Sequence, residues 1–354
     1  PEFAYSADKW ASLRDNVMEY GELADLIHEY NPTVRSNRST LSDQKKQNLT
    51  DINEQLLDDA RDLWDDASST DTDSYMGRMT AANLDFAGNT LAQTADKNFM
   101  DAEMYKISYD QTEANLVFQA QQLMTTYKQS AYTMENLNAN RALAQASYEA
   151  TVARQAAGMA TQTEVLTSLK NVQDIDANIL SAQKSTDNVY RSLLLMLGWS
   201  ADSQPEIRDI PEPDLARIGA MDPDADREQA LANNYEIKSD EHKLQNLKTN
   251  EQADATKADL EDKRNQVYSS LKTQYNAVLD AKDALDAANI KLQLETVNMN
   301  AASAKAATGN ISALELIQQQ TSYTTAKNSV ETGKMQLTLA MEKYDWIKKG
   351  LTFS

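Results

Sequence analysis

Gly158 and Gly309 stand in closely similar segments 151 positions apart, and this repetition constrains the fold more than any other feature of the sequence. The segments read ARQAAGMATQTEVL (residues 153–166) and AKAATGNISALELI (residues 304–317). A long stretch of helical pattern precedes each glycine and another follows it. Glycine just past a helix ends it, because glycine adopts positive φ without a Cβ clash. The sequence therefore predicts the same sharp turn between two antiparallel helices twice.

The residue types around the two glycines also repeat. A cation lies four residues before each glycine, a hydroxyl three after it and a carboxylate six after it, followed by two aliphatic residues: Arg154, Thr161, Glu164, Val165 and Leu166 in the first segment, and Lys305, Ser312, Glu315, Leu316 and Ile317 in the second. Ser or Thr three residues before Glu is typical of a capping box that starts a helix. We interpret Glu164 and Glu315 as such capping carboxylates in preference to pore-lining charges. Arg154 and Lys305 fit either solvated cations favoured by the helix macrodipole or contacts to a partner.

The composition favours long helices and excludes several classes of function. Among 354 residues there are nine Gly, six Pro and no Cys, and the formal net charge is −20. The lack of Cys excludes disulfides, thiolate metal sites and cysteine catalysis, and the lack of a basic cluster argues against binding nucleic acid. The acidity fits either simple solubility or an acidic lumen or mouth that favours cations. With only five Phe and four Trp, we expect thin seams between helices and no thick globular core.

The helical pattern divides the chain into segments. We expect helices over about 7–29, 33–67, 78–157 with a break near Gly88, 161–197, 230–308 with an interruption near 249–256, and 312–349. The Asn31-Pro32 pair ends the first of these, because the residue before proline avoids the α region. Residues 68–74 are polar and read as a loop. Residues 199–228 contain four of the six prolines and are interpreted as a linker between two halves.

A seven-residue repeat in the second half predicts a coiled coil. Leu271, Val278, Leu285, Leu292 and Met299 recur every seven residues, a period that implies supercoiling against a neighbouring helix. The fold class is therefore all-α, with elongated antiparallel coiled-coil hairpins in two tandem repeats, residues 4–198 and 229–350, and with little or no β structure. Helices this long cannot be covered by one hairpin partner, so we expect other copies of the chain to pack against them.

At this point the sequence resembles a known family, the TolC-like outer membrane efflux proteins. Their pattern of a cation, three residues, Gly, two residues, Ser or Thr, two residues, an acid and two aliphatics occurs twice, as it does here. The segments that resemble the starts of their two repeats are residues 26–34 (LIHEYNPTV) and 230–237 (ALANNYEI). Residues 194–198 (LLMLG) and 210–215 (IPEPDL) are similar to the end of the first repeat and the linker. The resemblance covers about residues 20–350.

The resemblance implies an assembly, a set of partners and a docking site. It implies a homotrimer whose hairpins form a hollow α-barrel, with tips that meet a membrane-fusion-type periplasmic adaptor of an ABC or other transporter. The implied docking tips are Arg154, Gly158, Thr161, Glu164, Val165, Leu166, Lys305, Gly309, Ser312, Glu315, Leu316 and Ile317. We find no ten-residue segment of alternating apolar and polar residues, so we expect a variant that lacks the strands of the family's membrane β-barrel.

The expected location is the cell envelope, outside the cytoplasm. The sequence contains no apolar run long enough for a transmembrane helix and no export signal. Pro1-Glu2-Phe3 resembles a cloning remnant, so we expect an export signal to have been removed from the natural chain.

No other motif points to chemistry. His28 and His242, the only histidines, lie far apart and lack neighbours at metal-ligand spacing. The loop Asp71-Thr72-Asp73-Ser74 lacks the glycine and terminal glutamate of a calcium loop. There is no nucleophile elbow, phosphate loop or triad spacing, so we expect no metal, no cofactor and no enzymatic activity. The alternative to a conduit is a structural coiled-coil envelope spacer or secreted helical bundle without a transport role.

Overall fold

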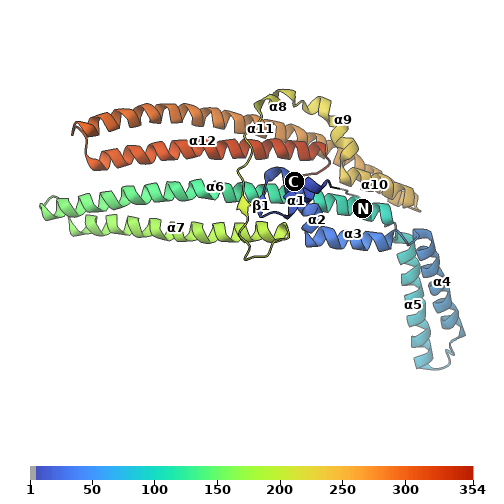
Figure 1. The fold of residues 1–354 in the computed structure, drawn as a ribbon. Coiled ribbons are helices and arrows are strands. Elements are labelled where there is room, and N and C mark those ends of the chain that lie inside the picture. Colours follow the sequence, from blue (N-terminus) through green and yellow to red (C-terminus); the bar gives the residue numbers. More distant parts are fainter. Residues whose placement is uncertain (1–4, 354) are drawn as a thin grey trace. The chain divides into compact units, whose positions relative to one another are not determined.

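The protein is almost entirely helical in a computed structural model that describes residues 5–353, so the cloning remnant expected at residues 1–3 lies outside the described part. The helices, in chain order, are α1 (Ala7–Arg14), the 3-10 helix η1 (Tyr20–Glu22), α2 (Leu23–Tyr30), α3 (Pro32–Gln44), α4 (Leu49–Ser69), α5 (Tyr75–Lys97), α6 (Ala102–Ala156), α7 (Gln162–Met196), α8 (Leu215–Ala220), α9 (Pro223–Asn233), α10 (Tyr235–Asn246), α11 (Asn250–Ala307) and α12 (Ala313–Lys348) (Figure 1). Two short strands, β1 (Val17–Met18) and β2 (Glu206–Ile207), pair in parallel. The all-α fold class expected from the sequence is confirmed.

The chain forms two compact units, and each takes segments from both halves of the sequence. The coiled-coil unit contains the residues up to 31, 116–224 and 271–346. The second unit contains residues 32–115 and 225–270 and those from 347 onward, and we call it the α4–α5 unit after its most distinct element. The long helices α6 and α11 each contribute to both units.

In the coiled-coil unit, two long hairpins are each closed by polar contacts between their helices. In the first hairpin, the guanidinium of Arg141 on α6 donates to the carboxylate of Asp176 on α7 at 2.5 Å. In the second, Gln319 Nε2 on α12 donates to Glu295 Oε2 on α11 at 2.7 Å. The hairpins predicted from the sequence are therefore both present.

The two hairpins lie side by side through α6 and α12. Asn328, fully buried on α12, donates from Nδ2 to Asn136 Oδ1 on α6 at 2.9 Å. The hydroxyl of Thr321 on α12 donates to the carbonyl of Ala139 on α6 at 3.3 Å. The helices thus form one layer in the order α7, α6, α12, α11, with α7 and α11 at its edges (Figure 1).

The heptad repeat forms the core between α11 and α12. Leu271, Val278 and Leu285 are buried, whereas Leu292 and Met299 are only half-buried. Gly333 on α12 faces Leu285, whose Cδ1 lies 3.3 Å from where a Cβ on the glycine would be. The coiled-coil seam is therefore tight over its first three heptad positions and looser toward the Gly309 turn.

The first expected helix, residues 7–29, is interrupted, and that part of the sequence prediction is wrong. Helix α1 ends at Arg14, and the chain runs extended through β1 before η1 and α2. The Asp15 carboxylate accepts a hydrogen bond from the Val17 amide at 2.9 Å, and the Asn16 carbonyl accepts one from the Glu206 amide at 2.8 Å. The interruption arises because this segment pairs with β2, which is distant in the sequence.

The proline-rich linker is more ordered than an irregular connection, since it contains β2, α8 and the start of α9. The guanidinium of Arg217 on α8 forms ion pairs with Glu342 and Asp345 of α12. Burial acts to lower the pKa of Arg217, but these carboxylates outweigh it and raise the pKa. Thr338 of α12 also donates to the carbonyl of Pro211 at 3.2 Å. The linker is thus fastened along α12 within the coiled-coil unit.

In the α4–α5 unit, the helix breaks differ from those expected. The structure breaks the chain at residues 45–48 and 98–101 and not near Gly88, which lies inside α5. Gly88 is buried, and a Cβ there would lie 2.6 Å from Trp64 Nε1 on α4, so this glycine permits close approach of two helices and does not end one. The break after α5 is fixed by Asn98 Nδ2, which donates to Asn53 Oδ1 at 2.9 Å.

The break between α10 and α11 lies at residues 247–249, at the start of the interval predicted from the sequence. Nearby, Asp101 accepts hydrogen bonds from the Met104 amide and from Asn246, and its carboxylate lies 2.6 Å from His242 Nε2. Burial acts to raise the pKa of Asp101, but the hydrogen bonds from Asn246, Met104 and His242 outweigh it and lower the pKa. This cluster joins the start of α6 to α10.

In each half of the chain, a buried asparagine near the start of the half contacts the glycine-ended helix at its end. In the α4–α5 unit, the fully buried Asn234 caps α10 by accepting from the Ile237 amide at 3.0 Å. Its Nδ2 donates to the Gly350 carbonyl at 3.2 Å and to the Thr352 hydroxyl at 2.9 Å. Gly350 has positive φ, 116°, as the sequence predicts for a helix-ending glycine.

The coiled-coil unit repeats this arrangement. Asn31 Nδ2 donates to the carbonyl of Met196 at 2.8 Å, at the end of α7. Gly198, which ends that helix with φ 83°, packs directly against Tyr30.

Among the described residues, no helix combines the length and apolar character needed to cross a membrane.

Candidate functional site

The first predicted turn, between α6 and α7, forms by local hydrogen bonds alone. Gly158 has φ 76°, and its amide donates to the Gln155 carbonyl at 2.8 Å. The Met159 amide donates to the Arg154 carbonyl at 2.8 Å. These two bonds are the Schellman arrangement, which satisfies the last carbonyls of a helix. The positive φ explains why glycine occupies this position.

Helix α7 then begins with a complete capping box. The Glu164 amide donates to Thr161 Oγ1 at 3.2 Å, and the Thr161 amide donates back to Glu164 Oε2 at 2.6 Å. The reciprocal bonds satisfy two amides that have no partner within the helix. The prediction that Glu164 caps the helix is confirmed.

The second turn, between α11 and α12, repeats this geometry. Gly309 has φ 71°, its amide donates to Ala306 at 3.0 Å, and the next amide donates to Lys305 at 2.8 Å. The Glu315 amide donates to Ser312 Oγ at 3.1 Å, and the Ser312 amide donates to Glu315 Oε2 at 2.7 Å. The corresponding hydrogen-bond lengths in the two turns differ by no more than about 0.2 Å, so the sequence repeat is also a structural repeat.

In each turn, hydrogen bonds and a cation of the same turn lower the pKa of the capping glutamate. The hydrogen bonds from the Thr161 amide and hydroxyl lower the pKa of Glu164, and the Arg154 cation lowers it further. The hydrogen bonds from Ser312 lower the pKa of Glu315 in the same way, with Lys305 as the nearby cation. Both carboxylates therefore remain ionised at neutral pH.

Burial separates the aliphatic residues that the sequence grouped together. Val165 is buried, and Leu316 and Ile317 are half-buried, so these three pack within their hairpins. Leu166 is 55% exposed, and Met159, which the sequence analysis did not single out, is 65% exposed. Among the predicted aliphatic contacts, only Leu166 lies free for a partner, and a Met at the apex of the turn joins it.

A groove of about 700 Å³ lies beside the first turn, between α6 and α7. Arg154, Thr161 and Glu164 line it, together with Thr151 on α6 and with polar residues further along α7, including Thr167 and Lys170. Added Cβ atoms at Gly158 and Gly309 would meet nothing within 4 Å, so both turns present bare backbone. Because α6 and α12 lie side by side, the two turns come to the same end of the layer (Figure 1).

Helix α11 carries an exposed apolar surface that was not predicted from the sequence. Ile290, Leu294 and Val297 on α11 are 67%, 58% and 65% exposed. Their spacing of four and then three residues places them on one face of the helix, away from the heptad seam. The heptad repeat on the opposite side of the same helix is the more regular apolar pattern in the sequence, so this stripe was not predicted.

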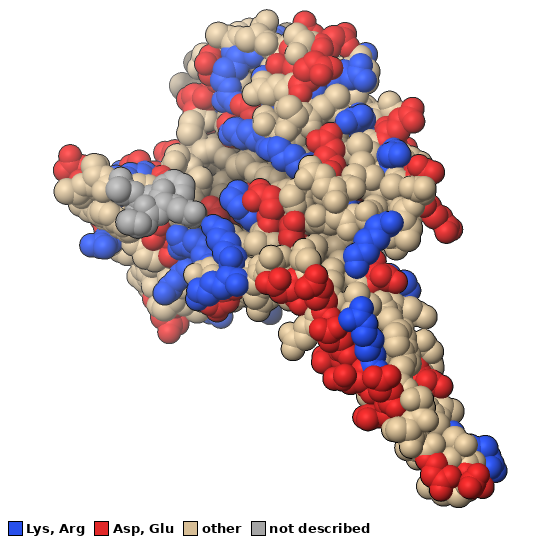
Figure 2. Space-filling view, turned by 90° about the vertical axis from the view of Figure 1, so that its right-hand side faces the viewer, with Lys and Arg blue, Asp and Glu red and all other residues tan. Residues whose placement is uncertain are grey.

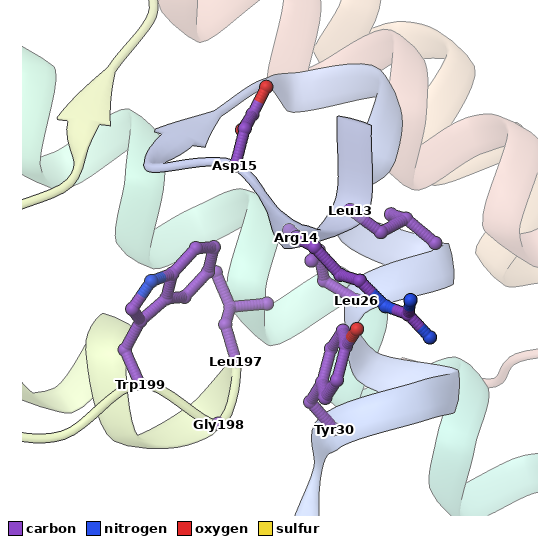
Figure 3. Close-up of a pocket in the computed structure, with 8 residues that line it drawn as sticks. All are labelled: Leu13, Arg14, Asp15, Leu26, Tyr30, Leu197, Gly198 and Trp199. Atoms are coloured by element: carbon purple, nitrogen blue, oxygen red, sulfur yellow. The ribbon is translucent and has the colours of Figure 1, made fainter. Parts of the chain in front are cut away.

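Outside the turns, the coiled-coil unit has a small pocket of about 240 Å³ (Figure 3). Leu26, Leu197 and Trp199 form its apolar wall, whereas the guanidinium of Arg14 and the carboxylate of Asp15 point to different sides. Its two charged groups therefore do not face each other across the pocket. Within residues 5–353, no cluster of three or more His, Asp or Glu side chains is placed to hold a metal ion.

Comparison with known proteins identifies the fold. No protein-family model matches the sequence, and comparison with curated proteins likewise finds no match. Among solved structures, the chain is similar to the outer-membrane channel OprN, with a TM-score of 0.58 and 11% identity over 98% of this chain and 93% of that one. It is also similar to the CmeC outer membrane channel of Campylobacter jejuni (TM-score 0.53, 10% identity, 98% and 88% covered).

The outer membrane protein VceC of Vibrio cholerae is similar as well, with a TM-score of 0.51 and 13% identity over 98% of this chain and 99% of that one. The similarity thus extends over nearly the whole of both chains and is not confined to one hairpin. The TolC-like fold expected from the sequence is confirmed.

Proposed function

We propose that this protein is a non-enzymatic, TolC-like component of the cell envelope that assembles outside the cytoplasm as a homotrimeric α-helical conduit. Its two turns dock a membrane-fusion-type adaptor of an ABC or other efflux or secretion transporter. Residues 4–198 and 229–350 are duplicated repeats joined by the linker 199–228. The observation that carries the proposal is the pair of matched turns at one end of a four-helix layer whose fold is that of outer-membrane channels.

The edges of the layer support assembly of several copies. The stripe formed by Ile290, Leu294 and Val297 lies on α11, an edge helix, and is exposed in the single chain. Exposed apolar stripes of this kind mark interaction surfaces. A second copy that places its own edge helix against α11 covers the stripe, and repeating the contact closes a ring. A closed ring of such layers encloses a lumen.

The turns suit docking because their shape is fixed before a partner arrives. Each is held by a Schellman motif and a capping box, so binding costs little conformational ordering. Met159 and Leu166 supply the exposed apolar contact at the first turn, and Arg154 supplies a cation beside it. The second turn offers Lys305 at the equivalent position.

Docking is tested with a variant and a control matched in position and exposure. Leu166 and Leu195 are both 55% exposed on α7, and they lie on nearly the same face about 44 Å apart. We expect Met159→Ser/Leu166→Ser to weaken adaptor binding at least tenfold and Leu195→Ser to leave it within about twofold. Adaptor binding is measured by titration with the purified adaptor, and native mass checks that both proteins keep the wild-type oligomeric state.

The assembly itself is tested by native mass and negative-stain imaging of the wild-type chain and of Ile290→Ser/Leu294→Ser. We expect hollow trimers from the wild type and a shift toward monomers in the variant. Solid bundles or monomers at all concentrations, together with no adaptor binding, would instead support the structural spacer.

A further inference from the structure

The α4–α5 hairpin has no role in the proposed conduit, and its two helices close tightly on each other. Ala60 and Ala67 on α4 and Gly88 and Ala95 on α5 are all buried between them. Small residues at a helix seam let two backbones approach closely. The hairpin therefore completes its own core without the outer face of α5.

That outer face of α5 is apolar and exposed. Tyr75, Met79 and Phe86 are 68%, 45% and 75% exposed, and Met76 beside them is 70% exposed. Their spacing places Tyr75, Met79 and Phe86 in one line about 16 Å long on the side of α5 opposite Gly88. We call these four residues the α5 stripe. Surface apolar residues scattered singly are ordinary, but four together on one helix face indicate an interaction surface.

The hairpin around the α5 stripe is strongly acidic. Residues 49–97 carry eleven carboxylates against three cations, a net charge of −8. Most of these carboxylates lie on α4, where they appear as red atoms along the hairpin in the lower part of Figure 2. Asp71 and Asp73 directly precede the stripe, and Asp85 adjoins Phe86.

The cation nearest the stripe is turned away from it. The guanidinium of Arg78 donates to the carbonyls of Thr72 and Asp73, at 3.1 and 3.4 Å, and so folds back on the loop before α5. The charged residues within two positions of Tyr75 and Phe86 in the sequence are Asp73 and Asp85, both acidic. These charges decide what kind of surface can cover the stripe.

We propose that the α5 stripe is the docking site of a partner protein's amphipathic helix, one with an apolar strip flanked by Lys and Arg. Such a helix buries the aromatic and Met side chains and places its cations against the carboxylates of the hairpin, which also speed the encounter. Two Met residues suit this role, because their flexible, polarisable side chains adapt to different apolar partners. The inference does not require that the protein be a conduit.

The same charges disfavour the other surfaces that could cover the stripe. A second copy of the hairpin brings another net charge of −8 to the contact, and at physiological salt charges still interact over about 8 Å. An anionic bilayer surface attracts basic segments and repels acidic ones. A cationic helix is the surface that satisfies both the apolar and the electrostatic character of the hairpin.

The test uses the full chain and a synthetic 18-residue amphipathic helix of Leu and Lys, with a Leu and Glu counterpart of the same pattern. Calorimetric titration at about 0.15 M salt compares wild type with Met79→Ser/Phe86→Ser. The control is Leu180→Ser/Leu195→Ser, which changes two exposed apolar residues of α7 without changing the charge. Phe86→Ala alone provides a milder variant, and circular dichroism checks that each variant is folded.

We expect the Lys peptide to bind the wild type and the control alike, and at least tenfold more weakly to Met79→Ser/Phe86→Ser, with Phe86→Ala in between. The Glu peptide should show no binding. Equal affinity for all variants would mean that only net charge attracts the peptide, and the proposal would be wrong. The proposal would also be overturned by a second result. In that result the wild type self-associates or binds phosphatidylcholine–phosphatidylglycerol vesicles, and Phe86→Ala abolishes this behaviour while peptide binding stays unchanged.

Discussion

Substituting alanine for the helix-ending glycines distinguishes two reasons for glycine at these positions: the positive φ of the backbone and the close packing of a neighbouring residue. Gly158 and Gly198 both have positive φ, 76° and 83°. At Gly158 an added Cβ meets nothing within 4 Å, whereas at Gly198 it would lie 2.5 Å from Tyr30 Cβ and 2.8 Å from the Tyr30 carbonyl oxygen. The same substitution therefore has one cost at the first site and two at the second.

The magnitudes follow from these two costs. A non-glycine residue in the left-handed region loses about 1–2 kcal/mol, and forcing an extra methyl into a packed site costs about 1–3 kcal/mol more. We expect Gly158→Ala to lower the free energy of unfolding by about 1–2 kcal/mol, and Gly198→Ala by about 2–5 kcal/mol.

The second half of the chain provides an independent copy of the experiment. Gly309 has φ 71° and open space around it, while an added Cβ at Gly350 would overlap the carbonyl of Asn233. Gly309→Ala should resemble Gly158→Ala, and Gly350→Ala should be at least as damaging as Gly198→Ala.

All four variants are compared by urea unfolding followed by circular dichroism at 222 nm, with the m-values checked for equality. Because the chain has two compact units, hydrogen exchange of peptides around each glycine shows where stability is lost. If alanine at the two open turns costs as much as at the two packed ones, close packing does not explain the difference between them, and the reasoning fails.

Four further predictions follow from single contacts. The pKa of Asp101 is lowered on folding, so the ionised carboxylate stabilises the folded protein fully above its unfolded pKa of about 4, and this stabilisation is lost as the pH falls through the lower folded value. The urea midpoint should therefore fall less between about pH 7 and about pH 2.5 in Asp101→Asn than in the wild type. Asn234→Ala removes three hydrogen bonds at a fully buried side chain and should cost about 2–4 kcal/mol in the same assay, against less than about 0.5 kcal/mol for the exposed Asn300→Ala. Thr161→Ala removes a helix cap and should cost about 1 kcal/mol by urea unfolding. The buried Tyr20 hydroxyl has no hydrogen-bond partner and burial raises its pKa, so thermal unfolding should show Tyr20→Phe to be as stable as the wild type or up to about 1 kcal/mol more stable.

The two turns and the long helices were predictable because their causes are local. The bonds that form the first turn join residues no more than five positions apart, from Arg154 to Met159 and from Thr161 to Glu164. The positive φ at Gly158 is a property that glycine alone accepts readily. Heptad spacing likewise marks a buried helix face before any partner is known.

The helix boundaries that were predicted wrongly lie where segments distant in the sequence pack together. Gly88 looks like a break in the sequence, but Trp64 packs on it and the helix continues. Val17 and Met18 lie in an apolar helical pattern, yet they form a strand because β2, nearly 190 residues later, pairs with them. Neither partner can be recognised from the segment itself.

The sequence by itself determined that this chain makes two like hairpins with like turns, because hydrogen bonds between near neighbours and the backbone freedom of glycine suffice to form them. Only the tertiary structure decided which aliphatic side chains of those turns face solvent, Leu166 but not Val165, since that depends on which helix packs alongside. It also decided that Asn31 and Asn234 fasten the start of each half to its end. Such contacts bridge well over a hundred residues, and their partners come together only once the helices have packed.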